Sequence, residues 1–347
     1  MQAIVYKGNK TFEVEQLKRP EIKNGEALLK VKAAAICGTD LRIIDHGHHR
    51  IPEGTSRILG HEIAGIIEAV SPDVRTLKPG MPVAVAPNIH CGTCYQCLRG
   101  NAHLCENYVA FGIGIDGGFA EYMVIPSKAI KQGNIIPMKS GTDYAQAALN
   151  EPLSCCLNSL EYTEFSMGET LLIVGAGPIG IMHTLLANSM GAAKVIVSEI
   201  CDDRLIDVQN FGADVTVNPT KQELKKTVME QTNGKGADVV IVACPVASAH
   251  NQALECLAPL GRMNIFGGLP KDNPMTTIDA NRIHYNYLKI VGTSRQSLRQ
   301  YMQTLHLIEE HKIDLKPIIT ESFGLDEAKD AFLQSGRGNG LKNLFIL

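Results

Sequence analysis

The chain has 347 residues, a length that favours two domains, each large enough to bury a core of its own. Its 33 basic and 36 acidic residues give a formal net charge of -3 without a long run of one sign, which disfavours nucleic acid or an anionic membrane as a partner. Ten cysteines in a chain of this length, without the pattern of a secretory signal at its start, favour reduced thiols and metal ligands over disulfides. We therefore expect a cytoplasmic protein that holds metal.

The first part of the chain, up to about Ala148, consists of short alternating segments broken by glycine and proline, which predicts an irregular β-rich domain. Two stretches within it carry metal-ligand residue types: Cys37 in "ICGTD", and His61 with Glu62 in "GHEIAG". A thiolate, an imidazole and a carboxylate are all zinc ligands. Taken alone, each residue also fits an ordinary core or surface role.

Four more cysteines lie close together in "CGTCYQCLRGNAHLC", at separations of three, three and eight residues. Four thiolates within fifteen residues suit a closed tetrahedral zinc site, and the glycines of the stretch supply the turns that bring them together. A closed site has no position for substrate, so we expect a structural zinc and look for the chemistry elsewhere. The predicted ligands are Cys91, Cys94, Cys97 and Cys105.

From Thr170 onward, short apolar segments alternate with helical stretches, which predicts a doubly wound parallel sheet of six strands. The predicted strands cover 170–175, 193–199, 213–218, 237–244, 261–268 and 287–292. The longest apolar run starts at Thr170 but contains three glycines, a proline and His183, so it predicts a strand turning into a helix and not a membrane span.

Gly175, Gly177 and Gly180 form a G-x-G-x-x-G turn directly after the first of these strands, where it can bind the pyrophosphate of a dinucleotide. Glu199, at the end of the second strand, can accept hydrogen bonds from a ribose and would repel a 2′-phosphate, which favours NAD over NADP. Arg204 could bind that phosphate and reverse the preference, or contact the ribose hydroxyls.

The C-terminal part contains an amphipathic helix over 297–312 and a last apolar strand over 341–347, and we expect it to return to the first domain. The predicted organisation is a β-rich catalytic domain over 1–152 and 293–347, with a dinucleotide-binding domain over 153–292. Substrate and zinc are expected in the cleft between the two.

The stretches "CGTD", "GHEIAG", the four-cysteine segment, "DGGFAEY", "NEPLS" and "VGAGPIG" occur in the order found in zinc-containing medium-chain dehydrogenases. The chain resembles this alcohol dehydrogenase superfamily over essentially its whole length. It is most similar to the polyol branch, which includes sorbitol dehydrogenase and galactitol-1-phosphate dehydrogenase. The resemblance implies an α/β fold with a Rossmann domain and a GroES-like catalytic domain, two zinc ions per chain, NAD, and a homo-oligomer.

The same resemblance assigns Cys37 and His61 as ligands of a catalytic zinc. Where simple alcohol dehydrogenases have a third cysteine ligand, this chain has Glu151, and in the polyol branch either Glu151 or Glu62 completes the zinc shell while the other acts nearby. A carboxylate in place of a thiolate makes the zinc harder and suits hydroxyl oxygens. Cofactor contacts are implied at Gly175, Gly177, Pro178, Ile179, Gly180, Glu199, Arg204 and Phe266.

The implied reaction is oxidation of a secondary hydroxyl of a polyol, or of its phosphate, to a ketone with hydride transfer to NAD. Thr39 matches the family position whose hydroxyl relays the alcohol proton, or else it caps the following helix. Arg42 stands where the family often ends this relay with a histidine, and arginine cannot act as a base. Arg295 falls where polyol enzymes carry an arginine beside the substrate, or else forms a salt bridge.

Other substrates and classes stay open. Arg42, Arg50, Arg57 and Lys271 could bind a substrate phosphate, but scattered basic residues are usually solvated, so a free polyol is favoured. Threonine and 2,3-butanediol are alternative substrates within the family. A zinc-independent reductase of the quinone reductase type, or a nucleotide sensor without catalysis, is disfavoured by the full set of metal ligands.

Overall fold

The computed structural model describes residues 1–8, 10–338 and 340–347, and these form two compact units. Unit 1 comprises Met1–Ser154 and Gln296–Leu347, and unit 2 comprises Cys155–Arg295. The boundaries expected from the sequence, 152 and 293, lie within a few residues of these. The change of rhythm in the hydrophobic pattern therefore falls close to the division of the chain into units.

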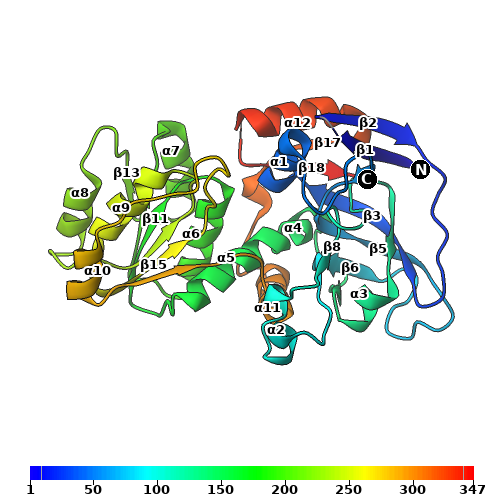
Figure 1. Ribbon diagram of the computed structural model, residues 1–347, viewed down its shortest axis with the longest axis horizontal. Helices are drawn as coiled ribbons and strands as arrows, with labels where there is room; N and C mark the ends of the chain where they lie inside the picture. The colour runs from blue at the N-terminus through cyan, green and yellow to red at the C-terminus, as the bar shows by residue number, and fades with distance from the viewer. Residues whose placement is uncertain (9, 339) are drawn as a thin grey trace. The chain divides into compact units, whose positions relative to one another are not determined.

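Unit 1 is built on a seven-stranded sheet in which β10, β6, β5, β3, β18 and β17 lie side by side in that order, and β9 also pairs with β3. The C-terminal strand β18 runs antiparallel to β3, so segments from both ends of the chain share one sheet (Figure 1). The strands are β3 (Ala27–Ala35), β5 (Glu62–Val70), β6 (Pro82–Val85), β9 (Tyr122–Ile125), β10 (Ile135–Pro137), β17 (Ile319–Phe323) and β18 (Lys342–Ile346).

Smaller elements complete unit 1. A three-stranded sheet has the order β2-β1-β4, and β7 pairs with β8. Their bounds are β1 (Gln2–Gly8), β2 (Thr11–Gln16), β4 (Arg57–Ile58), β7 (Asn88–Ile89) and β8 (Val109–Ala110). The helices are α1 (Gly38–His46), α2 (Tyr95–Leu98), η1 (Ala102–Leu104), α3 (Ser127–Lys131), α4 (Tyr144–Ala148), α11 (Leu298–Glu309), η2 (Lys316–Ile318), η3 (Leu325–Glu327) and α12 (Ala328–Arg337).

Three phenylalanines mark the centre of the unit 1 core. The rings of Phe119, Phe332 and Phe345 meet edge to face, with centroids 5.1 to 5.8 Å apart. This geometry is favourable for aromatic pairs. It joins α12 and β18 to the segment that leads into β9, so the C-terminal residues contribute to the core as well as to the sheet.

Unit 2 confirms the predicted doubly wound sheet. Its six strands have the order β13-β12-β11-β14-β15-β16, and every neighbouring pair is parallel. The order turns back at β11, the arrangement of dinucleotide-binding sheets. The strands are β11 (Thr170–Val174), β12 (Lys194–Ser198), β13 (Val215–Val217), β14 (Ala237–Val242), β15 (Leu257–Ile265) and β16 (Lys289–Gly292).

The fifth strand differs from the prediction because it begins at Leu257 and not at Gly261. Leu260 has a positive φ of 64°, and the register with β14 shifts between Ala237 and Val239. An irregular strand start that contains proline and glycine resembles a loop in sequence, since these residues normally mark turns.

Helices cover both faces of the unit 2 sheet (Figure 1). Helix α6 packs beside α7, and α8 packs beside α9. The core of the α8 and α9 face consists of aliphatic side chains from the central strands and from these helices, including Leu172, Val240, Val228 and Leu254. The helices are α5 (Asn150–Tyr162), which contains the boundary between the units, α6 (Pro178–Ser189), α7 (Asp202–Asn210), α8 (Leu224–Gln231), α9 (Ala247–Glu255) and α10 (Ala280–Asn286).

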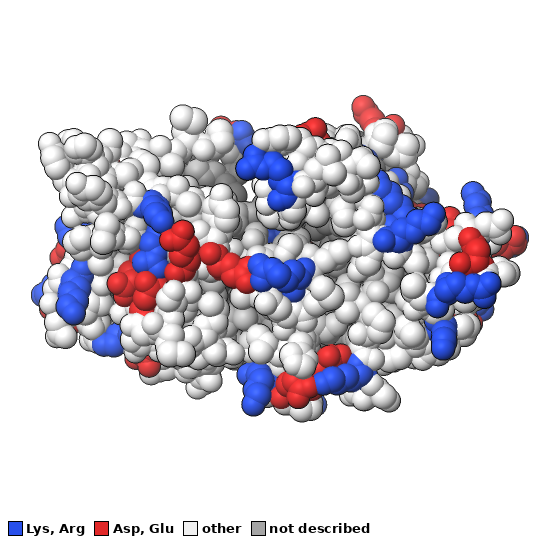
Figure 2. All heavy atoms as spheres, turned by 90° about the horizontal axis from the view of Figure 1, so that it is seen from below, with Lys and Arg blue, Asp and Glu red and all other residues white. Residues whose placement is uncertain are grey.

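The charged surface agrees with the small net charge of the sequence, -3. On the face shown in Figure 2, acidic and basic side chains lie near one another in small groups. Over the described part of the chain, we find no helix that combines the length and the apolar character needed to cross a bilayer.

Candidate metal centres and nucleotide-binding turn

The four cysteines predicted to hold a structural zinc converge in unit 1. The sulfur of Cys94 lies 3.5 Å from that of Cys97 and 3.9 Å from that of Cys105, and the sulfurs of Cys91 and Cys97 are also 3.9 Å apart. All four are free thiols. Four sulfurs bound to one zinc at about 2.3 Å would be about 3.8 Å apart, so the cluster fits a closed tetrahedral site.

Backbone groups prepare this cluster for metal. The N–H groups of Thr93 and Cys94 point at the sulfur of Cys91, and they lower the pKa of the Cys91 thiol to about 5. Burial instead raises the pKa of Cys97 to about 12. Since metal binds the thiolate, the low pKa of Cys91 favours binding, whereas Cys97 would release its proton to solvent when the ion binds.

A second cluster forms because two strands meet in a particular register. Ala35, at the end of β3, lies opposite Glu62, at the start of β5. Cys37 follows β3 after one residue, and His61 directly precedes β5, so the ligand atoms of Cys37, His61 and Glu62 all lie within 4.8 Å of one another. These three donors suit a catalytic zinc with an open position.

The helix start at Cys37 differs from one expectation. Helix α1 begins at Gly38 and its N-cap is Cys37, whose sulfur accepts a hydrogen bond from the backbone N–H of Thr39. The alternative role of Thr39 as the helix cap is therefore wrong. The Thr39 side chain is half-buried two residues after Cys37. The proton relay stays the predicted role of this side chain.

Asp40, which the sequence analysis did not single out, is fully buried beside the second cluster. Its carboxylate accepts hydrogen bonds from the backbone of Cys37 at 2.9 Å and of Gly60 at 3.3 Å, and it lies 3.4 Å from Nδ1 of His61. Burial lowers the pKa of His61, but the charges of Asp40 and Cys37 outweigh this effect and raise it well above its ordinary value. The signal was present in "CGTD", where an acidic residue stands three positions after the N-cap.

Lys342 is a second residue of this site that no sequence motif indicates. Its ammonium donates hydrogen bonds to Glu62 at 2.7 Å and to the backbone carbonyl of Ile36 at 2.8 Å. Burial raises the pKa of Glu62 to about 7, although Lys342 and His61 act in the opposite direction. The group therefore contains a carboxylate that a bound cation would stabilise in its ionised form.

Glu151 lies near this cluster. Among the described residues, the cluster consists of Cys37, His61 and Glu62 and does not include Glu151. It stands in the first turn of α5 and is 7% exposed. Its charge contributes to the raised pKa of Glu62, and after burial it is also the next cause that raises the pKa of Tyr301. Of the two candidates left open for the third ligand position, the geometry favours Glu62.

The basic residues considered for substrate recognition occupy different settings. Arg50 donates to the carbonyl of Tyr108 at 2.8 Å and stacks over its ring at 4.1 Å. Arg57 pairs with Asp116 at 3.0 Å, whereas Arg42 is exposed. Two of the four candidates for a phosphate site are thus engaged within the protein, and Lys271 is exposed in unit 2.

Arg295, the predicted substrate arginine, is the last residue of unit 2 and has a positive φ of 64°. A residue other than glycine rarely adopts this backbone conformation, and such strain is concentrated at functional positions. The carbonyl group of Arg295 accepts a hydrogen bond of 2.9 Å from Asn158.

The glycine-rich turn in unit 2 has the geometry that a pyrophosphate requires. Gly175 has a φ of 110°, and a Cβ on Gly180 would lie 2.0 Å from the carbonyl oxygen of Gly175. Gly177 is the N-cap of α6, with Pro178 in its first turn, and a Cβ there would meet nothing within 4 Å. The N-terminus of this helix and the open space beside Gly177 fit a bound diphosphate.

Glu199 lies against this turn. One oxygen of its carboxylate accepts the N–H of Ala176 at 2.9 Å, and the other accepts those of Ile200 at 2.7 Å and Cys201 at 3.1 Å. The negative charge is thereby held beside the position expected for the adenosine ribose. Arg204 is half-buried on α7, one turn further along the chain.

The two remaining predicted cofactor residues meet a buried histidine. His183 donates from Nδ1 to the carbonyl of Ile179 at 2.8 Å, and its ring meets Phe266 edge to face at 5.1 Å. Nε2 lies 2.6 Å from the hydroxyl of Ser159. His183 therefore connects α5, α6 and the end of β15 behind the glycine-rich turn.

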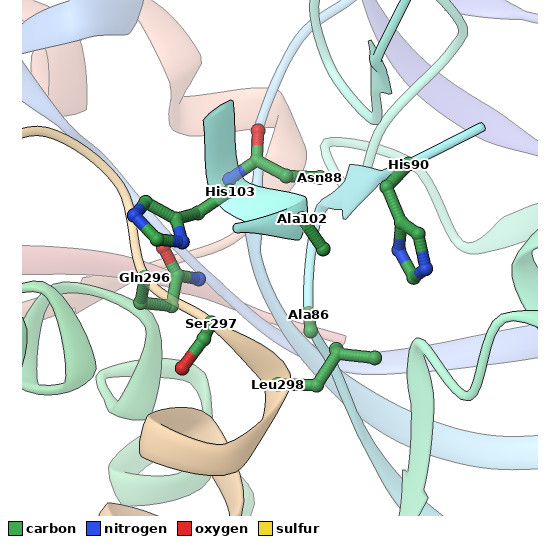
Figure 3. A pocket seen from close by; sticks show the side chains of 8 residues that line it. All are labelled: Ala86, Asn88, His90, Ala102, His103, Gln296, Ser297 and Leu298. Atoms are coloured by element: carbon green, nitrogen blue, oxygen red, sulfur yellow. The ribbon is translucent and has the colours of Figure 1, made fainter. Parts of the chain in front are cut away.

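A small polar pocket in unit 1 lies beside the four-cysteine segment. Figure 3 shows His90 on one side of it and His103 and Gln296 on the other. The rest of its lining consists of Ala86, Asn88, Ala102, Ser297 and Leu298. None of the residues predicted for metal, cofactor or substrate lines this pocket.

Two family models match the chain. Residues 23–135 match the alcohol dehydrogenase GroES-like domain, and residues 178–310 match the zinc-binding dehydrogenase domain. The chain is 36% identical over 342 residues to the L-threonine 3-dehydrogenase of Pyrococcus horikoshii. This match covers 96% of this chain and 95% of that protein.

Solved structures show the same relationship. A protein of Sinorhizobium meliloti 1021, assigned as a zinc-binding dehydrogenase and solved with NADP, matches with a TM-score of 0.92 at 30% identity over 100% of this chain and 99% of its own. Galactitol-1-phosphate dehydrogenase from Escherichia coli matches with a TM-score of 0.90 at 25% identity over 100% of both chains.

These similarities extend along the chain and agree with the two ligand clusters and the glycine-rich turn. They identify an alcohol dehydrogenase type of enzyme that uses zinc and a nicotinamide cofactor. The chain belongs to the zinc-binding dehydrogenases.

Proposed function

We propose that this enzyme oxidises the secondary hydroxyl of a small polar alcohol to a ketone, and that L-threonine is its first candidate substrate. The convergence of Cys37, His61 and Glu62 is the observation that carries the alcohol chemistry. The relative at 36% identity, an L-threonine 3-dehydrogenase, supports the substrate. The sequence motifs favour a polyol over threonine, and this similarity favours the reverse order.

The metal, the cofactor and two nearby residues have different roles in the proposed reaction. Cys37, His61 and Glu62 would hold a zinc ion, which would supply the Lewis acidity that lowers the pKa of a substrate hydroxyl, and a nicotinamide would supply the hydride acceptor. Asp40 holds the segments of both Cys37 and His61 in place. Thr39 would accept the hydroxyl proton, a role that is supported by its place two residues after Cys37 and by the finding that Cys37 is the N-cap of α1.

The cofactor that we propose is NAD. Glu199 lies against the glycine-rich turn with a charge that would repel a 2′-phosphate. Three backbone N–H groups hold this carboxylate against the turn, so its position beside the expected ribose is fixed.

A polyol is the second candidate substrate, supported by the similarity to galactitol-1-phosphate dehydrogenase. Among polyols we expect the unphosphorylated form, because Arg50 and Arg57 are engaged with Tyr108 and Asp116.

A panel of alcohols tests these proposals. NADH or NADPH formation is measured with L-threonine, 2,3-butanediol, sorbitol, galactitol and galactitol-1-phosphate, each with NAD and with NADP. We expect the highest kcat/KM for L-threonine with NAD. His61→Ala should lose turnover and keep NAD affinity, whereas His46→Ala, an exposed histidine at the end of α1, should behave like the native enzyme.

Each result has a direct consequence. A polyol turned over more efficiently than threonine would replace the first candidate with the second. A preference for NADP would contradict the role given to Glu199. Full activity of His61→Ala would contradict the proposed alcohol chemistry at this site.

A further inference from the structure

His183 is a buried polar residue that connects α6 to α5 and to the end of β15. It is 0% exposed, and its Nδ1 lies 2.8 Å from the carbonyl oxygen of Ile179, in the first turn of the same helix. Its Nε2 lies 2.6 Å from the hydroxyl of Ser159 on α5, and its ring meets that of Phe266 edge to face. Burying a polar ring costs solvation free energy unless its nitrogens form hydrogen bonds, so these contacts explain how a histidine is kept here.

The partners of His183 determine which ring nitrogen carries the hydrogen. Burial lowers the pKa of His183 to about 4, although the bond to Ile179 acts in the opposite direction, so the ring is neutral and has one N–H. A carbonyl oxygen can only accept, so Nδ1 donates to Ile179 and Nε2 accepts from the hydroxyl of Ser159. This hydroxyl is also 2.8 Å from the carbonyl of Cys156, but its contact with Nε2 is the shorter one. The ring is thus held from α5 while it holds the first turn of α6.

The first turn of α6 has little of its own to fix its conformation. Its N-cap is Gly177, which has no side chain to cap the helix, and Pro178 has no N–H, so Ile179 provides the first N–H within the helix. Three of the six residues from Gly175 to Gly180 are glycine, which loses more conformational freedom on ordering than any other residue. A contact that orders this turn before the cofactor binds therefore lowers the entropic cost of binding.

The contact with Ile179 is made at the end of the turn that the diphosphate does not use. In an α-helix each N–H points toward the N-terminus and each carbonyl toward the C-terminus, and anions bind at the N–H end. His183 holds Ile179 by its carbonyl group. The N–H end of the turn is therefore left to the ligand.

We propose that His183 is a positioning residue for the cofactor, and that its hydrogen bond to Ile179 holds the first turn of α6 in the conformation that binds the diphosphate. The proposal rests on the proposed function in one respect, the choice of NAD as the cofactor. His183 does not touch the cofactor in this account and acts through Ile179. Its loss should weaken ligands that contain a diphosphate and spare a ligand without one.

Three ligands give the test. The dissociation constant of NADH is measured by its fluorescence, and those of ADP-ribose, which keeps the diphosphate, and of adenosine, which has no phosphate, by competition against NADH. His183→Leu removes one hydrogen bond that orders the turn, so it should weaken NADH and ADP-ribose by the same factor, roughly 5- to 10-fold, and leave adenosine unchanged. Native affinity for NADH, or an equal loss for all three ligands, would overturn the proposal.

Two further variants separate the two nitrogens of the ring. In His183→Asn the amide nitrogen takes the place of Nδ1 and can still donate to Ile179, whereas in His183→Gln the amide takes the place of Nε2 and faces Ser159. We expect nearly native NADH affinity in His183→Asn and an affinity as weak as that of His183→Leu in His183→Gln. Native affinity in His183→Gln, or no recovery in His183→Asn, would show that the bond to Ile179 is not the route.

Ser159→Ala keeps the test valid if the His183 variants fold poorly. It removes only the hydroxyl that donates to Nε2, on a different helix. It should weaken NADH and ADP-ribose by a smaller factor than His183→Leu and spare adenosine. Unchanged affinity for NADH in Ser159→Ala would count against a ring that is held from α5 and would overturn the proposal.

His250→Leu is the matched control. His250 is 1% exposed on α9 of the same unit, and neither of its ring nitrogens has a hydrogen-bond partner among the described residues. Its affinities for all three ligands should equal those of the native protein, and a selective loss of the diphosphate ligands here as well would remove the support for His183. If the native protein bound NADPH more tightly than NADH, the choice of NAD would fail by itself, and the same comparison with NADPH would decide the role of His183.

Discussion

Asp40 shows how a single buried residue prepares the catalytic cluster. It accepts hydrogen bonds from the backbone of Cys37 and of Gly60, and its carboxylate lies beside the ring of His61. Both ligand-bearing segments therefore depend on one carboxylate that does not itself belong to the cluster. Partners of metal ligands at this distance usually fix the orientation of the ligand.

Asp40→Asn tests this role, because it keeps the shape of the side chain and removes its charge. We expect zinc affinity at the catalytic site to fall by roughly 10- to 100-fold while the fold is retained. Chelator competition measures the affinity, and circular dichroism checks the fold. Asp45→Asn is the control, since Asp45 lies exposed on the same helix. An unchanged affinity in Asp40→Asn would show that His61 needs no such partner.

At the scale of elements, the four-cysteine segment has almost no core of its own. Between residues 91 and 105, all of which the structure describes, Cys105 is the one buried residue. Tyr95 and Leu98 are largely exposed. The segment therefore depends on its metal for a fixed conformation, as small metal-bound folds do.

Limited trypsin digestion tests this dependence. Arg99 is exposed within the segment, so removal of zinc should make the chain susceptible to cleavage after Arg99, and added zinc should protect it again. Mass spectrometry of the fragments locates the cut. Equal resistance with and without chelator would contradict a structural zinc site.

Helix α6 contains the buried His183, whose contribution to the pH dependence of stability can be tested. Burial lowers its pKa to about 4, so the folded protein keeps this ring neutral under conditions where the unfolded chain protonates it. Because the unfolded state then binds more protons, stability is full above about pH 6.5 and is lost as the pH falls toward 4.

The difference between His183→Gln and the native protein measures this contribution. We expect the native protein to lose about 2 kcal/mol more than the variant between pH 7 and pH 5. Urea unfolding of both proteins at both pH values gives the comparison, with His311→Gln, an exposed histidine, as the control. The same pH dependence in all three proteins would contradict a buried neutral His183.

Across the whole molecule, short sequence patterns predicted the features that depend on residues close together in the chain. Alternating strands and helices predicted the six-stranded sheet, and short spacings predicted the four-cysteine cluster, because both depend on residues close in sequence. The choice between Glu62 and Glu151 required the register of β3 against β5, which no short stretch encodes.

The contact of Lys342 with Glu62 could not be predicted from the sequence for the same reason. Lys342 meets Glu62 across 280 positions of the chain, through the pairing of β18 with β3 and of β3 with β5. The available signal was a lysine inside an apolar strand, which indicates a buried partner without identifying it. The predicted homo-oligomer stays a prediction.

Zinc-dependent catalysis by this enzyme is tested most directly by a chelator titration in which zinc content and threonine-dependent NADH formation are followed together. Two zinc ions per chain are expected at the start, and activity should fall in step with the loss of one of them. Cys37→Ser should contain one zinc and no activity from the outset. Activity that persists after both ions are removed, or a Cys37→Ser protein with two zinc ions and full activity, would contradict catalysis by a zinc ion bound at Cys37.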